Sequence, residues 1–71
     1  MNLGTRIAEK RAEKGISQEK LAEKLGVSRA YLSYIENGVK VPTLAMFAQI
    51  AKELDASAEW LLFGNDRKLN A

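Results

Sequence analysis

The chain has 71 residues and a net charge of +2, from 11 Lys and Arg against 9 Asp and Glu, and it contains no Cys and no His. A chain this short forms a single domain that buries only roughly 60% of its unfolded surface, so its apolar core or an oligomer must stabilise it. The lack of Cys and His excludes disulfides, structural zinc sites, thiol chemistry and His-based triads. The longest apolar run is far shorter than the ~20 residues of a membrane span, and no signal peptide is recognisable, so we expect a cytoplasmic protein.

The positive charge lies in the first half of the chain. Residues 1–40 carry 8 Lys and Arg and 5 Asp and Glu, a net of +3, whereas residues 41–71 carry 3 and 4, a net of −1. This bias is compatible with a polyanionic partner, although many ordinary domains share it.

Apolar residues recur at three- and four-residue spacing, which predicts five short helices and no strand. A Ser or Thr precedes each of the last four helices, where its side chain can cap the free N–H groups, and a turn signal follows every helix. The expected N-caps are Ser17, Ser28, Thr43 and Ser57, and the expected stops are Gly15, Gly26, Asn37-Gly38, Asp55-Ala56 and Gly64. We expect residues 1–65 to form one domain and residues 66–71 to be a frayed tail.

The same spacing predicts which side chains face the core. In the fourth helix it selects Leu44 along with Phe47 and Ile50, and it places Met46 on the outer side. The remaining core candidates are Leu3, Ile7, Leu21, Ala22, Leu25, Tyr31, Leu32, Ile35, Ala51 and Leu54.

The joint between the second and third helices is the most informative feature. Ala22 lies four residues before Gly26, and a small side chain there allows two steeply crossing helices to approach. Gly26 can adopt a positive φ without steric cost, and Ser28 begins the next helix after about three residues. These constraints predict a helix-turn-helix, whose second helix can lie in a DNA major groove.

Residues 17–28 (SQEKLAEKLGVS), followed by residues 35–38 (IENG), closely resemble the Cro/phage-repressor (Xre-type) helix-turn-helix family. The resemblance continues to Trp60-Leu61-Leu62 and covers about residues 3–64. It implies an all-α, compact, five-helix lambda-repressor-like DNA-binding domain. Members of this family bind double-stranded DNA, mostly as dimers on palindromic operators.

The outward face of the third helix carries the candidate base contacts. Arg29 can donate two hydrogen bonds to a guanine, and the small Ala30 can meet a thymine methyl or allow close approach. The hydroxyls of Ser33 and Tyr34 can reach base edges, and that of Tyr34 can also reach a phosphate. By similarity these four positions match the base-contacting positions of the family; the alternative is an ordinary solvated face.

Four further residues are candidates for phosphate contacts, which position a protein without specifying sequence. Gln18 and Ser28 lie at helix N-termini, which favour anions, and Gln18 matches a standard contact of the family. Asn37 and Lys40 follow the third helix and could hold more distant phosphates. The alternatives are a plain N-cap for Ser28, a turn residue for Asn37 and a solvated lysine for Lys40.

Two features remain, an ion pair and an apolar run. By similarity, Arg11 and Glu36 form the partly buried ion pair of the family, which ties the first helix to the end of the third. The consecutive Trp60, Leu61, Leu62 and Phe63 point all round the fifth helix, so we expect Leu61 in the core and Trp60, Leu62 and Phe63 at a dimer interface. A fully intramolecular core is the alternative.

The leading hypothesis is a sequence-specific DNA-binding transcriptional regulator, a homodimeric repressor that inserts its third helix in the major groove. The alternative is an antitoxin or anti-regulator that mainly binds a partner protein through its fourth or fifth helix. No nucleophile–base set, carboxylate pair or phosphate loop indicates an enzyme, and nothing indicates a cofactor, a metal, a small-molecule ligand or a membrane.

Overall fold

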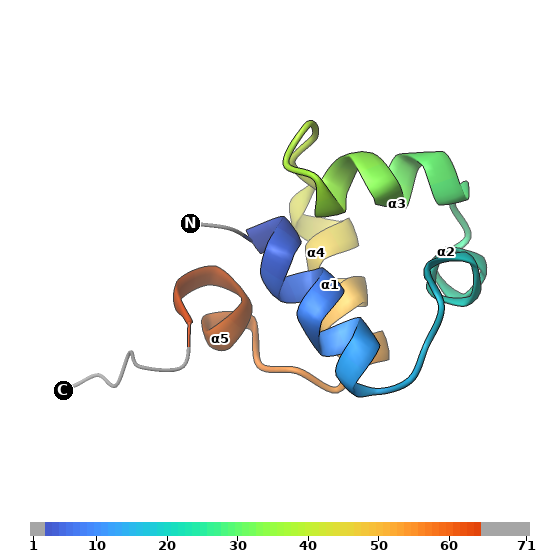
Figure 1. The fold of residues 1–71 in the computed structure, drawn as a ribbon. Helices are drawn as coiled ribbons and strands as arrows, with labels where there is room; N and C mark the ends of the chain where they lie inside the picture. Colours follow the sequence, from blue (N-terminus) through green and yellow to red (C-terminus); the bar gives the residue numbers. More distant parts are fainter. Residues whose placement is uncertain (1–2, 65–71) are drawn as a thin grey trace, which may run out of the picture.

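The computed structural model describes residues 3–64, and these residues form five helices without a strand (Figure 1). The predicted all-α, five-helix fold is therefore confirmed for this part of the chain. The expected domain limit at residue 65 and the tail at 66–71 lie outside the described residues. The helices are α1 (Leu3–Glu13), α2 (Gln18–Leu25), α3 (Arg29–Glu36), α4 (Leu44–Leu54) and α5 (Ala58–Phe63).

Helix boundaries follow the caps that the sequence predicts. Each N-cap hydroxyl accepts a hydrogen bond from the backbone N–H three residues ahead, at 2.8 to 3.1 Å. Gly26 ends α2 in the left-handed region with φ 75°, and Asp55 ends α4 there with φ 52°. Replacing such an N-cap with Ala typically costs about 1 kcal/mol, so these short helices gain appreciably from their caps. The four N-caps are Ser17, Ser28, Thr43 and Ser57.

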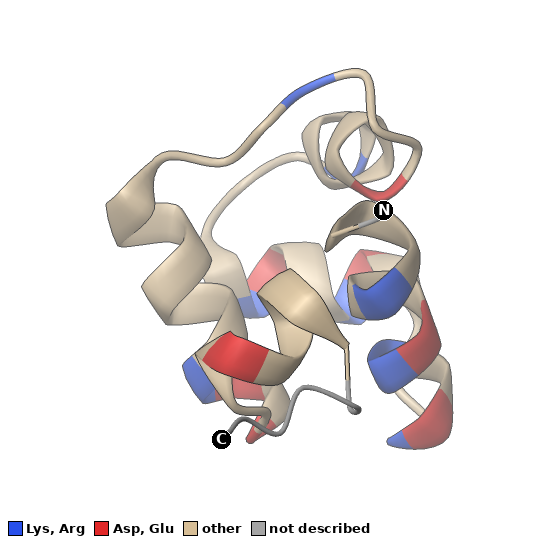
Figure 2. Ribbon diagram, turned by 90° about the vertical axis from the view of Figure 1, so that its left-hand side faces the viewer, with Lys and Arg blue, Asp and Glu red and all other residues tan. Residues whose placement is uncertain are grey.

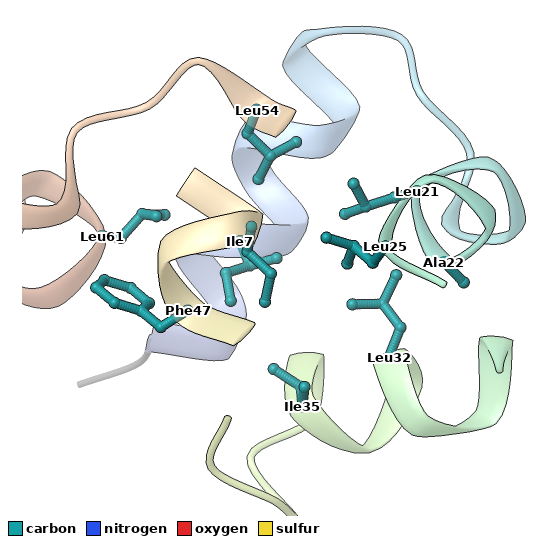
Figure 3. Packing of buried hydrophobic residues seen from close by; sticks show 10 residues of the cluster. Ile7, Leu21, Ala22, Leu25, Leu32, Ile35, Phe47, Leu54 and Leu61 are labelled. Carbon is teal, nitrogen blue, oxygen red and sulfur yellow. The ribbon is translucent and has the colours of Figure 1, made fainter. Parts of the chain in front are cut away.

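Apolar side chains from all five helices meet in one core (Figure 3). Ala22, with 2% of its surface exposed, lies where α2 packs against α3, as its small size predicts. Leu61 anchors α5 in this core and is fully buried, which confirms its predicted place. The buried set is Ile7, Leu21, Ala22, Leu25, Leu32, Ile35, Phe47, Ile50, Leu54 and Leu61.

The predicted face of α4 is wrong at its first turn. Leu44 was expected in the core but is 82% exposed, whereas Met46 was expected outside and packs against the core. Met46 lies one turn before Ile50 and so shares its buried face, while Leu44 lies at the edge of the stripe in the first position of the helix. The spacing alone could not show that the core ends before the helix does.

Gly4 permits a close approach that the sequence did not reveal. It is buried where α1 meets the carboxyl end of α3. A Cβ at this position would lie 2.6 Å from the carbonyl oxygen of Glu36 and closer still to that of Ile35. Any larger residue would therefore push α1 away from α3. The only sequence signal is a glycine within an apolar-periodic segment.

Candidate nucleic-acid interface

The joint between α2 and α3 has the backbone of a tight helix-turn-helix. Gly26 donates its N–H to the carbonyl of Glu23 at 3.1 Å, and Val27 donates to that of Ala22 at 3.0 Å. Ser28 then caps α3, so only three residues separate the two helices. In Figure 1, α3 lies along the upper edge of the molecule with its outer side uncovered.

The four candidate base-contacting residues share that outer side of α3. Arg29, Ala30 and Tyr34 are exposed, and Ser33 is half-buried. Ser33 Oγ accepts a hydrogen bond from Asn37 Nδ2 at 3.2 Å. The structure therefore brings the four side chains together on one polar, accessible face that combines donors, acceptors and a small residue. This combination suits base edges in a major groove.

Gln18 connects α2 to both ends of α3. Its Oε1 accepts a hydrogen bond from Arg29 Nη1 at 3.2 Å, and its Nε2 donates to Glu36 Oε1 at 3.0 Å. The sequence had predicted a phosphate contact for Gln18 but neither of these bonds. The hydrogen bond to Gln18 restricts the long side chain of Arg29, which would otherwise sample many rotamers. Arg29 therefore loses less conformational entropy when it binds a ligand.

Arg11 and Glu36 form a two-point ion pair at the base of this network. Arg11 Nε lies 2.8 Å from Glu36 Oε2, and Nη2 lies 3.0 Å from Oε1. Arg11 Nη1 also donates to the carbonyl of Ile16 at 3.0 Å. The Glu36 side chain is 5% exposed and that of Arg11 18%. The hydrogen bonds to Glu36 raise the pKa of the Arg11 guanidinium above its ordinary value, because they favour its charged form.

The remaining phosphate candidates flank α3. Ser28 Oγ accepts the N–H of Tyr31, so its side chain is engaged as a cap. Asn37 and Lys40 are exposed. The backbone N–H of Lys40 donates to the carbonyl of Tyr34 at 3.1 Å, which folds the α3–α4 loop back onto the end of α3. Figure 2 shows this loop crossing the top of the molecule beside α3.

The candidates for a dimer interface divide between the core and the surface. Leu62 is 42% exposed and Phe63 58%. Trp60 is only half-exposed, because it packs against the core and Lys10 Nζ lies 4.7 Å from the centre of its ring. The outward surface of α5 is therefore formed by Leu62 and Phe63 more than by Trp60.

Residues 3–64 contain no group of three or more Asp or Glu side chains arranged to hold a metal ion. None of the helices in that range is both long enough and apolar enough to cross a bilayer.

Comparison with known proteins decides the family. A helix-turn-helix family model matches residues 7–61, which contain α2, α3 and α4 in full. This chain belongs to the Cro/C1-type helix-turn-helix family. The family and the relatives below are transcriptional regulators rather than enzymes.

Two curated relatives are similar over most of the chain. An uncharacterized HTH-type transcriptional regulator of Archaeoglobus fulgidus is 40% identical over 65 residues, which cover 92% of this chain and 93% of that protein. The transcriptional regulator SinR of Bacillus subtilis is 41% identical over 61 residues, which cover 84% of this chain and 55% of SinR. The chain thus spans only about half the length of SinR.

Solved structures of similar proteins include complexes with DNA. SinR in complex with DNA superposes with a TM-score of 0.78 at 41% identity, covering 84% of this chain and 97% of that one. The P22 c2 repressor in complex with a synthetic operator superposes with a TM-score of 0.84 at 29% identity, covering 92% of this chain and 98% of that one. The predicted lambda-repressor-like fold is confirmed.

Proposed function

We propose that this chain is a sequence-specific, double-stranded DNA-binding transcriptional regulator that acts in the cytoplasm as a homodimeric repressor on a palindromic operator. The observation that carries the proposal is the uncovered polar face of α3, at whose start Arg29 is held by Gln18. The DNA complexes of the SinR and P22 c2 structures support it, since both share the fold.

In this proposal α3 enters the major groove and the flanking residues hold the phosphates. Arg29 donates to a guanine, and Ser33 and Tyr34 contact neighbouring base edges beside the small Ala30. The N-terminus of α2 presents free N–H groups and a positive dipole end to a phosphate, with Gln18 beside it. After the end of α3, Lys40 and Asn37 hold a second phosphate. At the start of α3, the backbone N–H of Ser28 makes a further phosphate contact.

A second copy would bind through the outward surface of α5, formed by Leu62 and Phe63 with the accessible part of Trp60. One domain contacts few base pairs, whereas a two-fold dimer binds two half-sites about 34 Å apart. The exposed apolar area of Leu62 and Phe63 supports this assignment.

A second candidate function is the binding of a partner protein, as an antitoxin or anti-regulator would do. It is favoured by a group of exposed apolar residues at the start of α4 and in the loop before it: Val39 is 69% exposed, Val41 83% and Leu44 82%. Such surfaces often mark protein contacts.

Selection of binding sites from a random duplex library, followed by sequencing, tests the proposal. We expect a palindromic consensus whose half-sites lie about one helical turn apart. If no sequence is enriched and binding is only nonspecific and salt-sensitive, specific DNA binding by this chain is wrong and the partner-protein function becomes the better explanation.

A further inference from the structure

The position of α5 depends on contacts with the rest of the fold. The helix has six residues, which is too short to be stable on its own. Within α5 only Leu61 is fully buried, and Trp60 packs against the core while staying partly exposed, so apolar packing holds the helix in place but fixes its rotation only loosely. The other contacts of α5 therefore decide which way its exposed side chains point.

Arg6 makes the most directional of these contacts. It lies on α1, and its guanidinium Nε donates to the carbonyl of Leu61 at 2.9 Å while Nη2 donates to that of Leu62 at 2.9 Å. Carbonyls in the last turn of a helix have no partner within the helix, and a cation is favourable at that end of the helix dipole. The planar fork of a guanidinium can hold two successive carbonyls at a set angle, which the flexible ammonium of Lys cannot do.

Lys10 supports the same arrangement one turn further along α1. Its ammonium lies over the ring of Trp60, 4.7 Å from the centroid. Two cations four residues apart on α1 thus contact α5, one at its carboxyl end and one at a side chain in its middle. Figure 1 shows α5 beside α1, and Figure 2 looks onto α5 with the basic residues of α1 next to it.

The same helix α1 also fixes α3. Gly4 lets α1 approach the carboxyl end of α3, and Arg11 pairs with Glu36 there. The helix proposed to enter the major groove and the helix proposed to meet a second copy are therefore both attached to α1. A change in how α5 is attached would change the angle between the two copies without altering α3.

We propose that Arg6 is a positioning residue of the dimer: by holding the last turn of α5, it sets the direction in which Leu62 and Phe63 face a second copy, and hence the half-site spacing that the dimer accepts. This inference rests on the proposed dimerisation through α5. It assigns to Arg6 no contact with DNA and no contact with the second copy.

Arg6→Lys tests the proposal because it keeps the charge and removes the fork. Three duplexes are compared by fluorescence anisotropy: the selected palindrome, the same palindrome with about five base pairs inserted between its half-sites, roughly half a helical turn, and a duplex with one half-site. The unmodified chain is expected to prefer the palindrome over the lengthened duplex by about tenfold or more, because the second copy adds avidity only at the right spacing. Arg6→Lys is expected to reduce that preference to about twofold or less while binding the single half-site as well as the unmodified chain.

Arg6→Gln and Leu62→Glu complete the experiment. Arg6→Gln loses the charge as well and is expected to behave like Arg6→Lys, whereas Leu62→Glu should abolish the preference by disrupting the surface itself. An undiminished preference in Arg6→Lys, with Leu62→Glu defective, overturns the role of Arg6 and leaves the α5 dimer standing. An undiminished preference in Leu62→Glu overturns the α5 dimer. Loss of half-site binding or of helical circular dichroism in both Arg6 variants also overturns the inference, because Arg6 would then support the fold as a whole.

Discussion

Glu36→Ala is expected to destabilise the fold strongly, because it leaves Arg11 without its charge partner. The Glu36 carboxylate is 5% exposed and accepts two hydrogen bonds from Arg11 and one from Gln18. Breaking a buried ion pair from one side costs about 3–5 kcal/mol. We expect about 3 kcal/mol, the lower end of that range, because Arg11 is 18% exposed and keeps its bond to the Ile16 carbonyl.

A loss of this size is large for a domain of 71 residues, whose free energy of unfolding is on the order of 4–10 kcal/mol. Urea denaturation followed by circular dichroism measures it directly, and a thermal melt should show a midpoint lowered by roughly 12–24 °C. Glu23→Ala is a matched control: its pair with Lys20 has an N···O distance of 3.5 Å and side chains 72% and 60% exposed. Removing such a surface pair costs about 0.5 kcal/mol or less.

A double variant separates the charge from the packing. Arg11→Met combined with Glu36→Met removes both charges and is expected to recover most of the stability lost in the single variant, because no uncompensated charge stays buried. If Glu36→Ala unfolds at the same urea concentration as Glu23→Ala, the assigned role of the buried pair is refuted.

Gly4→Ala is expected to destabilise by about 1–3 kcal/mol, opposite in sign to the usual gain from Gly to Ala in a helix, because the methyl collides with the end of α3; a higher melting temperature would contradict this. Arg29→Ala should reduce the discrimination between bases at one position by about 1–3 kcal/mol, as measured on a panel of point-substituted duplexes. The salt slope, which is the slope of log binding constant against log salt concentration, should stay nearly unchanged. Lys40→Ala should instead weaken binding to every duplex and reduce the salt slope by about one; a change confined to one base position would oppose a phosphate contact. Leu44→Ser should change stability by less than about 0.5 kcal/mol in urea denaturation, against about 2–5 kcal/mol for Ile50→Ala, and equal losses would mean that Leu44 is not exposed.

Much of the candidate site could be predicted from local sequence patterns. The outward face of α3 follows from the helical period once Leu32 and Ile35 are placed in the core, and the structure indeed exposes Arg29 and Tyr34. What stays a prediction is the role of these side chains on DNA. The bonds of Gln18 could not be anticipated, because they depend on how α2 and α3 cross and not on the sequence of either helix.

The sequence by itself determined where the last four helices start, where all five end and, except in the first turn of α4, which stripe of each is apolar. Capping hydroxyls, turn glycines and a 3.6-residue period act within one or two turns of a helix, so they can be recognised from the sequence alone. Only the tertiary structure decided the contacts between distant segments: the exposure of Leu44, the fit of Gly4 against α3, and the bond from Arg6 to a carbonyl 55 residues away. These contacts depend on how whole helices pack. The apolar stripe of a helix shows which of its faces is buried, but neither how far the core extends along that face nor which other helix packs against it.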